Sequence, residues 1–460
     1  MSIPQQALPG ARPERPAPAM REGVVTLILG LTVVLVIMNT MMFNLALPDV
    51  AADFQLSASS TSWIVTGYSI VFAISSITYS RLSDFIPLRR LFLISILSLS
   101  LAAVAGYFSN SFLSLLLVRL VQASGAGAIP ALSLVLIARY VPIERRGKAM
   151  AAIMSAASLG LSLGPVAGGA IVEYLGWHFL FVVTAITVLL VPFFAALIPA
   201  EKPQQGSFDV PGAAFAAIGT TGLLLFLTSS SWIALAAGAA SLALFVARIR
   251  TAEEPFVAPA LFRNRTYLML GAVGIGGYLC SFATLYMLPQ ILVRHYELSA
   301  IGAGLIIFPG SLLSMLLSRK VGGFIDLKGN DAIIRYIPFV MLLSVVLFAV
   351  FVGSGYVAIL LAYMVLSVGF TFLTSSISNE MSRILKPKQI GSGMGLFQLL
   401  QFFSGAFGVA LTASALGWQK AYTLPHAFSN IYWGLAVVAL ASIACGLAYL
   451  RSRSRQTATA

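Results

Sequence analysis

The chain carries very little charge: only 9% of its 460 residues are Asp, Glu, Lys or Arg, whereas 59% are hydrophobic. A water-soluble core could not hide that much apolar surface, so this composition excludes an ordinary soluble domain. Runs of about 20 apolar residues can cross a bilayer as helices. The sequence therefore predicts an all-α membrane protein.

Cysteine and histidine are also scarce, with two and three copies. Cys280 and Cys445 both fall in apolar segments, where buried thiols are expected and a disulfide is not. The three histidines are far apart in sequence and have no metal-ligand spacing. We find no phosphate-binding loop and no Gly-x-Ser-x-Gly elbow. We therefore expect no metal, no cofactor and no enzymatic activity.

Fourteen apolar segments are long enough to be candidate membrane spans, and the connecting loops are mostly too short for soluble domains. The eighth segment is the shortest. The segments are residues 24–46, 61–81, 91–109, 112–138, 148–172, 178–199, 211–229, 232–247, 266–290, 299–318, 333–352, 355–377, 391–416 and 430–450.

The basic residues predict how the chain is oriented. Apart from Arg119, Arg294 and Lys420, they lie in or beside the N-terminal tail, the even-numbered loops and the C-terminal tail. The positive-inside rule then places both termini in the cytoplasm. The net charge of +13 is interpreted as this orientation signal and as contact with anionic membrane lipid. Because the basic residues are dispersed, a nucleic-acid partner is not expected.

The fifth apolar segment contains an unusual cluster of glycines and a proline. It has the pattern G-x-x-x-G-P-x-x-G-G, formed by Gly160, Gly164, Pro165, Gly168 and Gly169. Small residues allow two membrane helices to approach closely, which is the simpler interpretation of this pattern. The pattern also resembles the fifth-helix signature of drug/proton antiporters of the major facilitator superfamily. That resemblance implies a major facilitator fold with a central cavity.

A loop motif supports the same resemblance. Residues 80–90 (SRLSDFIPLRR) are similar to the major facilitator motif between helices two and three, in which Asp84, Arg89 and Arg90 match. A carboxylate at a helix end can pair with arginine and with the N-terminus of a neighbouring helix. We expect these residues to latch the cytoplasmic side, although both motif glycines are replaced, by Ser80 and Pro87. An ordinary solvated loop is the alternative.

A second copy of this motif, residues 322–329 with Asp326, follows the tenth predicted helix. The family's twelve-helix members have it after helix eight, so the displacement implies an inserted pair, helices seven and eight. The predicted organisation is a cytoplasmic tail (1–23), a six-helix bundle (24–200), a linker with the inserted pair (201–250), a second six-helix bundle (251–450) and a cytoplasmic tail (451–460).

Four further patterns support and narrow the resemblance. Residues 119–128 are similar to the family's fourth-helix motif, and residues 44–49, 138–149 and 307–310 are similar to the fourteen-helix drug-antiporter branch. Within that branch, the chain is most similar to Gram-positive tetracycline-efflux antiporters. Arg119 lies inside a span, where a cation normally faces a cavity or a partner. The resemblance implies that it serves proton coupling or the central network. It further implies a monomeric transporter of the bacterial plasma membrane that exports tetracycline-like or other amphiphilic drugs in exchange for protons.

The resemblance fails at the acidic residues, because no Asp or Glu lies at mid-span. Asn39, Thr40, Leu161 and Gly405 occupy positions where related branches have carboxylates. Coupling could use peripheral acids such as Asp49 and Asp84, the substrate could carry the charge, or transport could be uncoupled. Neutral, zwitterionic or anionic amphiphiles fit better than permanent cations. An alternative function is a non-canonical or uncoupled transporter of lipid-like molecules on the same scaffold.

The expected substrate site lies at the midplane, where helices one, four and five face helices nine, twelve and thirteen. Aromatic walls with sparse amide groups suit an adaptable small-molecule site, although any one residue could serve helix packing instead. The candidates are Asn39, Thr40, Gln122, Tyr278, Phe282, Tyr286, Gln290, Gln398 and Gln401.

Overall fold

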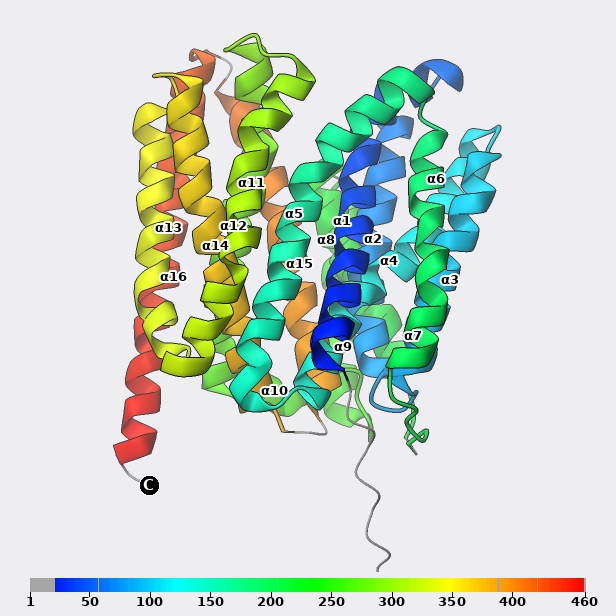
Figure 1. The fold of residues 1–460 in the computed structure, drawn as a ribbon, viewed down its shortest axis with the longest axis vertical. Coiled ribbons are helices and arrows are strands. Elements are labelled where there is room, and N and C mark those ends of the chain that lie inside the picture. Colours follow the sequence, from blue (N-terminus) through cyan, green and yellow to red (C-terminus); the bar gives the residue numbers. More distant parts are fainter. Residues whose placement is uncertain are drawn as a thin grey trace, which may run out of the picture.

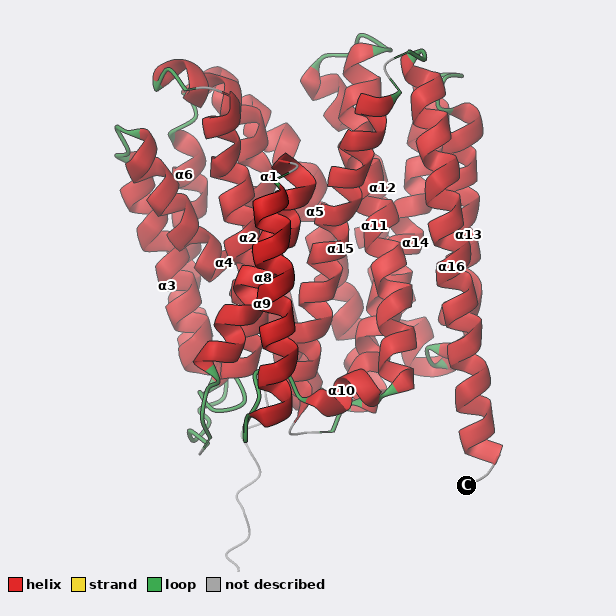
Figure 2. Ribbon diagram, turned by 180° about the vertical axis from the view of Figure 1, so that it is seen from behind, coloured by secondary structure: helices red, strands yellow, loops and turns green. Residues whose placement is uncertain are grey.

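The computed structural model describes residues 21–56, 58–204, 206–229, 231–386, 389–419 and 421–458. Within these residues all regular elements are helices and no strand occurs (Figure 2). The helices are α1 (Glu22–Asp53), α2 (Ala58–Leu82), α3 (Leu88–Tyr107), α4 (Phe112–Tyr140), α5 (Ile143–Leu175), α6 (Phe179–Ala185), η1 (Ile186–Leu190), α7 (Val191–Leu197), α8 (Val210–Ser229), α9 (Trp232–Thr251), α10 (Pro259–Arg263), α11 (Arg265–Arg294), α12 (Ala300–Lys328), α13 (Asp331–Phe351), α14 (Tyr356–Ile384), α15 (Ile390–Trp418) and α16 (Leu424–Ala458).

Each predicted apolar segment overlaps one helix or one run of helices. Among the described residues, twelve helical stretches are long and apolar enough to cross a membrane, and two shorter apolar stretches, Val210–Leu223 and Gly302–Leu317, accompany them. The all-helical membrane fold is therefore confirmed, whereas the count of fourteen spans stays a prediction.

The sixth predicted segment is not one uniform helix, because it divides into α6, the 3-10 turn η1 and α7. Pro192 stands in the first turn of α7 and has no N–H to donate to the preceding turn. The chain therefore tightens into a 3-10 turn before it. The other helix ends follow local chemistry: Ser111 caps α4 through the Ser114 N–H, and Gly176, at φ +88°, ends α5.

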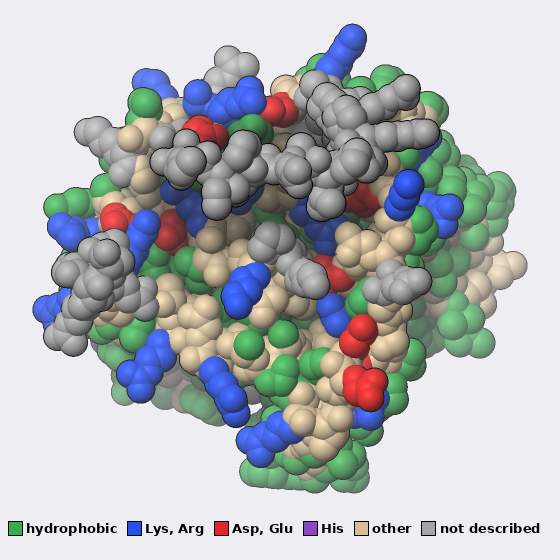
Figure 3. Space-filling view, turned by 90° about the horizontal axis from the view of Figure 1, so that it is seen from below, with side chains coloured by type: hydrophobic (Ala, Val, Ile, Leu, Met, Phe, Trp, Pro, Cys, Tyr) green, Lys and Arg blue, Asp and Glu red, His purple; other side chains and the backbone are tan. Residues whose placement is uncertain are grey.

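The helices run along the long axis of the molecule, and the described chain begins and ends at the same end of it (Figure 1). The ion pairs at this end include Glu22 with Arg145 at 2.9 Å and Arg453 with Asp331 at 2.6 Å. We call this end the terminal face and the opposite end the far face. Lys and Arg side chains are scattered over the terminal face (Figure 3).

The pattern of helix packing repeats along the chain. In the N-terminal group (α1 to α7), α1 packs on α5 and α4 packs on both α2 and α3. In the C-terminal group (α11 to α16), the corresponding pairs are α11 with α15, and α14 with both α12 and α13. The two groups meet mainly where α5 packs on α12 and where α2 packs on α15.

Between the groups, α8 and α9 form a closely packed hairpin. A Cβ atom at Gly222 would lie 2.6 Å from the Ala234 carbonyl oxygen and 2.6 Å from the Gly238 Cα atom. The two backbones can approach this closely only because both positions are glycine. The hairpin lies against α2 and α15 through α8.

Asp209, just before α8, anchors this hairpin. Its buried carboxylate accepts hydrogen bonds from the Arg248 Nε atom at 3.0 Å and from the backbone N–H groups of Gly212 at 3.1 Å and Phe256 at 3.2 Å. Burial raises the pKa of Asp209, but these hydrogen bonds and the Arg248 charge outweigh it, so its pKa lies below the ordinary value.

We expect Asp209→Asn to lower the stability of the protein at neutral pH by about 1–3 kcal/mol, because an amide cannot replace all three charge-assisted contacts. A depressed carboxylate pKa contributes stability above the unfolded-state value of about 4, and this contribution is lost as pH falls through the folded-state pKa. Thermal unfolding in detergent should therefore show a gap between wild type and Asp209→Asn at pH 7 that narrows towards pH 3. A gap that is constant with pH would contradict this account.

Candidate functional site

A cavity of about 640 Å³ lies between the two groups of helices. Its wall is formed by α1, α2 and α5 on one side and by α11 and α15 on the other, and it contains no charged side chain among the described residues. The lining residues are Ile37, Thr40, Met41, Val65, Ser69, Ile70, Phe72, Ala73, Leu161, Phe282, Leu285, Tyr286, Phe402, Phe403, Ala406, Val409, Ala410, Ala413 and Ser414.

The cavity occupies the half of the molecule nearer the far face. The lining part of α15 runs from Phe402 to Ser414, which begins about 18 Å and ends about 36 Å along the helix from its start at the terminal face. On α1, Thr40 lies about 27 Å along the helix from Glu22. The cavity therefore extends from mid-depth towards the end opposite both chain termini.

Three of the substrate-site candidates line this cavity: Thr40, Phe282 and Tyr286. Two others, Asn39 and Gln122, lie instead in a buried network around Arg119 behind the wall. The Thr40 hydroxyl bridges the two environments, since it donates to the Val36 carbonyl at 3.1 Å and to the Tyr68 hydroxyl at 3.4 Å.

The remaining candidates do not line the cavity. Tyr278 is buried and stacks on Phe282 with ring centroids 5.6 Å apart, so it supports the aromatic wall from behind. Gln290 uses its amide on the Tyr286 carbonyl one turn earlier, at 3.2 Å. Gln398 and Gln401 are buried within α15, and the Gln398 Oε1 atom and both amide atoms of Gln401 have no hydrogen-bond partner.

The helix set of the wall differs from the expectation in two respects: α2 lines the cavity where α4 was expected, and α14 contributes no described lining residue. Two glycines of α4 explain the first difference. A Cβ atom at Gly127 would lie 2.1 Å from the Phe72 carbonyl oxygen of α2, and one at Gly125 would lie 2.2 Å from the Ser95 carbonyl oxygen of α3. Because α4 packs so closely behind α2, it is screened from the cavity.

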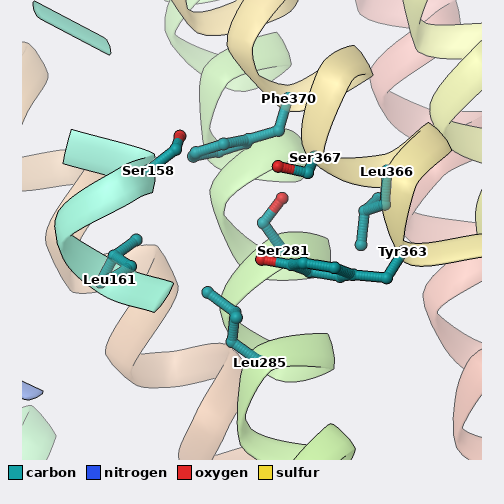
Figure 4. Close-up of a pocket in the computed structure, with 8 residues that line it drawn as sticks. All are labelled: Ser158, Leu161, Ser281, Leu285, Tyr363, Leu366, Ser367 and Phe370. Carbon is teal, nitrogen blue, oxygen red and sulfur yellow. The ribbon is translucent and has the colours of Figure 1, made fainter. Parts of the chain in front are cut away.

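A much smaller chamber adjoins the cavity between α5, α11 and α14 (Figure 4). Leu161 and Leu285 line both spaces. The chamber holds about 10 Å³, roughly enough for one water molecule, and the hydroxyl groups of Ser281 and Ser367 point towards its middle. The Ser281 hydroxyl is buried and has no hydrogen-bond partner, so the chamber is a polar recess in an apolar wall.

Hydroxyl groups join the two groups of helices beside this chamber. Ser162 of α5 hydrogen-bonds to Ser311 of α12, which in turn lies 3.4 Å from the Tyr363 hydroxyl. Nearer the terminal face, the Ser155 hydroxyl donates to the Ser314 carbonyl at 3.4 Å. A hydrogen bond between neutral hydroxyl groups can be replaced by another at little net cost in free energy, so these contacts hold the two groups of helices together only weakly.

Arg119 is completely buried about 10 Å from the far-face end of α4. Its guanidinium carbon lies 3.9 Å from the Phe43 ring centroid and 4.0 Å from that of Tyr68, so the group lies over both rings. The Nη1 atom donates to the Gln122 Oε1 atom at 3.0 Å and to the Asn39 Oδ1 atom at 3.5 Å. All four of these partners are uncharged.

The glycines of the fifth-helix motif form the contact between α5 and α1. A Cβ atom would lie 2.8 Å from the Val34 carbonyl oxygen at Gly160, 2.4 Å from the Met41 Cβ atom at Gly164 and 2.8 Å from the Met42 Cα atom at Gly168. Pro165 and the half-buried Gly169 belong to the same stretch of α5. The motif therefore presses α5 against the part of α1 that lines the cavity.

At the terminal face, Asp84 lies between two arginines and the start of α15. Its carboxylate accepts from Arg81 at 2.8 Å and from Arg139 at 3.0 Å, and the backbone N–H of Ser392 also donates to it. Gly391 allows this approach, since a Cβ atom there would lie 2.2 Å from the Asp84 Oδ1 atom. Burial raises the pKa of Asp84 above its ordinary value, although the arginines act in the opposite direction.

The other charged candidates are placed differently. Arg89 and Arg90, in the first turn of α3, take part in none of the described ion pairs, and Arg81 and Arg139 contact Asp84 instead. Asp49 is exposed on α1. The side chain of Asp326 lies outside the described residues.

Several residues without a predicted role join helices at the terminal face. The Arg146 Nη1 atom donates across the seam to the Ser382 hydroxyl at 3.1 Å. Glu380, only 2% exposed, accepts from Tyr449 at 2.8 Å and pairs with Arg453 at 2.9 Å. The polar residues that follow the apolar part of α14 in sequence could have pointed to Ser382 and Glu380. The predicted span ended at 377, however, whereas α14 continues to Ile384 and carries both residues on the helix.

Comparison with known proteins identifies the family. The family model described as Major Facilitator Superfamily matches residues 29–409. Two curated relatives are the riboflavin transporter RibZ of Clostridioides difficile, 26% identical over 87% of this chain and 89% of its own, and the lincomycin resistance protein LmrB of Listeria monocytogenes, 27% identical over 91% and 90%.

Among solved structures, the human organic anion transporter MFSD10 matches with a TM-score of 0.68, covering 91% of this chain and 99% of that one at 17% identity, which supports the fold alone. Because the family model matches most of the chain, the protein belongs to the Major Facilitator Superfamily. It is a multi-pass membrane transporter and not an enzyme.

The contacts of Asp84 predict the behaviour of the terminal face. Removing one partner of a buried ion pair is costly, so Asp84→Asn should favour separation of the two groups there. In a variant with Cys280 and Cys445 replaced by serine, a cysteine at Ser382 should react with a maleimide at least about tenfold faster after Asp84→Asn.

Lys202→Gln, a change at an exposed residue, is the matched control and should leave the rate unchanged. Equal labelling rates in the wild type, Asp84→Asn and Lys202→Gln would contradict a latch at Asp84.

Proposed function

We propose that this major facilitator protein exports uncharged or anionic amphiphilic small molecules by alternating access. The observation that carries the proposal is the cavity of about 640 Å³ between the two groups of helices, lined by apolar and hydroxyl-bearing residues without a charge. A volume of this size suits a drug-sized ligand held by apolar walls and a few polar groups. An uncharged wall offers nothing to offset the desolvation of a permanent cation.

The moving parts in this proposal are residues 24–200 and residues 251–450. They would rock about the seams α5–α12 and α2–α15, where glycines and hydroxyl groups make the contacts. The inserted pair within 201–250 would stay outside the transport path. No described residue of α8 or α9 lines the cavity, which supports this division.

The predicted orientation assigns the cavity to one stage of the proposed export cycle. With the terminal face in the cytoplasm, the cavity lies on the external side of a closed cytoplasmic layer that includes Asp84 and Arg146. This arrangement corresponds to an outward-facing state, in which an exporter releases its substrate. The basic residues scattered over the terminal face support this orientation through the positive-inside rule (Figure 3).

Drug efflux is the best-supported biological role. One relative is named for lincomycin resistance and another for riboflavin transport, and the first of these names supports the role. Tetracycline-like drugs remain within the proposed range. The second candidate, movement of lipid-like amphiphiles, is favoured by the predominance of apolar residues in the cavity wall.

Proton exchange would have to use a carboxylate near one face, because no acidic side chain lines the cavity among the described residues. Asp49 is exposed on α1 and within reach of solvent at the far-face end. Asp84 is half-buried in the latch, and burial raises its pKa. We propose that Asp49 is the external proton site. Asp84 is then the group that leaves its contacts when the terminal face opens.

A single carboxylate in the cavity should change the preferred charge of the substrate. Ser69 lines the cavity, and its hydroxyl bonds only to its own helix, at the Val65 carbonyl. In proteoliposomes, Ser69→Asp should reduce transport of the anion 2-naphthoate by at least about tenfold and confer transport of the cation ethidium. The reason is that a carboxylate in a low-dielectric cavity repels an anion and attracts a cation strongly. Ser69→Asn is the matched control and should transport as the wild type does. Unchanged preference in Ser69→Asp would place the substrate elsewhere.

A pH gradient tests coupling separately. If Asp49 carries protons, inverted vesicles with an acidic interior should accumulate substrate in the wild type, whereas Asp49→Asn should only equilibrate it and retain downhill exchange. Accumulation that depends on neither the gradient nor Asp49 would exclude proton exchange through Asp49. It would then favour uncoupled movement of an amphiphile.

A further inference from the structure

Arg119 is a buried cation without a counter-ion. Its side chain is 0% exposed, and no described ion pair includes it. A guanidinium group stays protonated in proteins, so neutralisation by loss of a proton does not relieve the charge. The carbonyl oxygens of Asn39 and Gln122 and the two aromatic rings supply only partial negative charge.

Three hydrogen-bond donors at this place have no partner among the residues that the structure describes. They are the Nε and Nη2 atoms of Arg119 and the Nε2 atom of Gln122, all of them buried. The two residues are already joined at 3.0 Å through the other guanidinium nitrogen and the Gln122 Oε1 atom. Buried donors normally have partners, and a cluster of three beside one uncompensated charge is therefore exceptional.

A single kind of ligand satisfies both deficits. A water molecule could accept hydrogen bonds from the donors, but it would leave the positive charge uncompensated. An anion accepts from the same N–H groups and also neutralises the guanidinium charge, and charge-assisted hydrogen bonds are the stronger kind. We propose that Arg119 and Gln122 form a binding site for a small anion or for the anionic group of a substrate.

The position of the site connects it to the cavity. Tyr68 covers Arg119, and the Tyr68 hydroxyl receives hydrogen bonds from Thr40 at 3.4 Å and from Asn39 at 3.3 Å. Thr40 and Ser69, the neighbour of Tyr68, both line the cavity. Tyr68 and Thr40 therefore form a one-residue-thick partition between the cavity and the anion site. This inference rests on the proposed transport function only for the route by which the anion arrives.

Binding is measured without transport, on the purified full-length protein. Sodium chloride should raise the unfolding temperature relative to sodium gluconate at equal ionic strength, or sodium 2-naphthoate should raise it relative to the naphthoate methyl ester. The first result assigns the site to a free halide and the second to a carboxylate of the substrate. Either supports the anion site. If neither anion stabilises the wild type, the proposal is wrong.

Three variants at the site and one control variant connect the effect to the site. Gln122→Glu, and likewise Asn39→Asp, places a carboxylate beside the guanidinium, so it should stabilise the protein without added anion and raise the half-maximal anion concentration at least tenfold. Arg119→Met should also lose the response, and Gln122→Glu keeps the test valid if Arg119→Met does not fold. Arg146→Met, which removes another buried arginine, should respond as the wild type does. Equal responses in all variants would show a general salt effect and overturn the proposal.

Transport then distinguishes the role of the anion. If a free halide occupies the site, efflux of the neutral ester should fall at least tenfold when chloride is replaced by gluconate. If the substrate's carboxylate occupies it, efflux of naphthoate should continue without chloride and should be inhibited by it. Failure of all transport with retained anion stabilisation would refute the proposed export function and leave the anion site standing.

Discussion

The contact between α1 and α5 fixes the geometry on which the cavity depends. Gly160, Gly164 and Gly168 bring the α5 backbone so close to α1 that any Cβ atom would overlap Val34, Met41 or Met42. Because α1 is held there, two neighbouring residues of α1 have different surroundings. Thr40 lines the cavity, whereas Asn39 accepts a hydrogen bond from Arg119. Lipid is as apolar as the helix surfaces, so no hydrophobic driving force brings the helices together. Close packing therefore does what apolar burial does in a soluble core.

The electrostatic design follows from the same arrangement. The buried carboxylates of Asp209 and Glu380 and the half-buried carboxylate of Asp84 form ion pairs near the terminal face, whereas the buried cation Arg119 lies towards the far face among neutral groups. Charge is thus concentrated near the terminal face, and no described residue that lines the cavity is charged. This separation supports the proposal that the substrate is uncharged or anionic.

The sequence predicted much of the fold, because apolar length, basic loops and the glycine motif report directly on membrane helices. It predicted the location of Thr40, Phe282 and Tyr286 for the same reason, since helical spacing places them on inner faces. It could not distinguish α2 from α4 at the cavity, which depends on how closely Gly125 and Gly127 let α4 pack behind α2. Nor could it place Glu380 or the partition formed by Tyr68, because both depend on contacts between distant helices.

Distances between the two groups of helices test the central claim most directly. One pair of spin labels would join α2 to α15 at the terminal face, and a second pair would join α1 to α11 at the far face. Electron–electron double resonance in lipid nanodiscs, with and without a neutral amphiphile, would measure the distance within each pair. Alternating access predicts a second population in which the terminal-face distance lengthens while the far-face distance shortens. Two distances that stay fixed, or that lengthen together, would contradict the account.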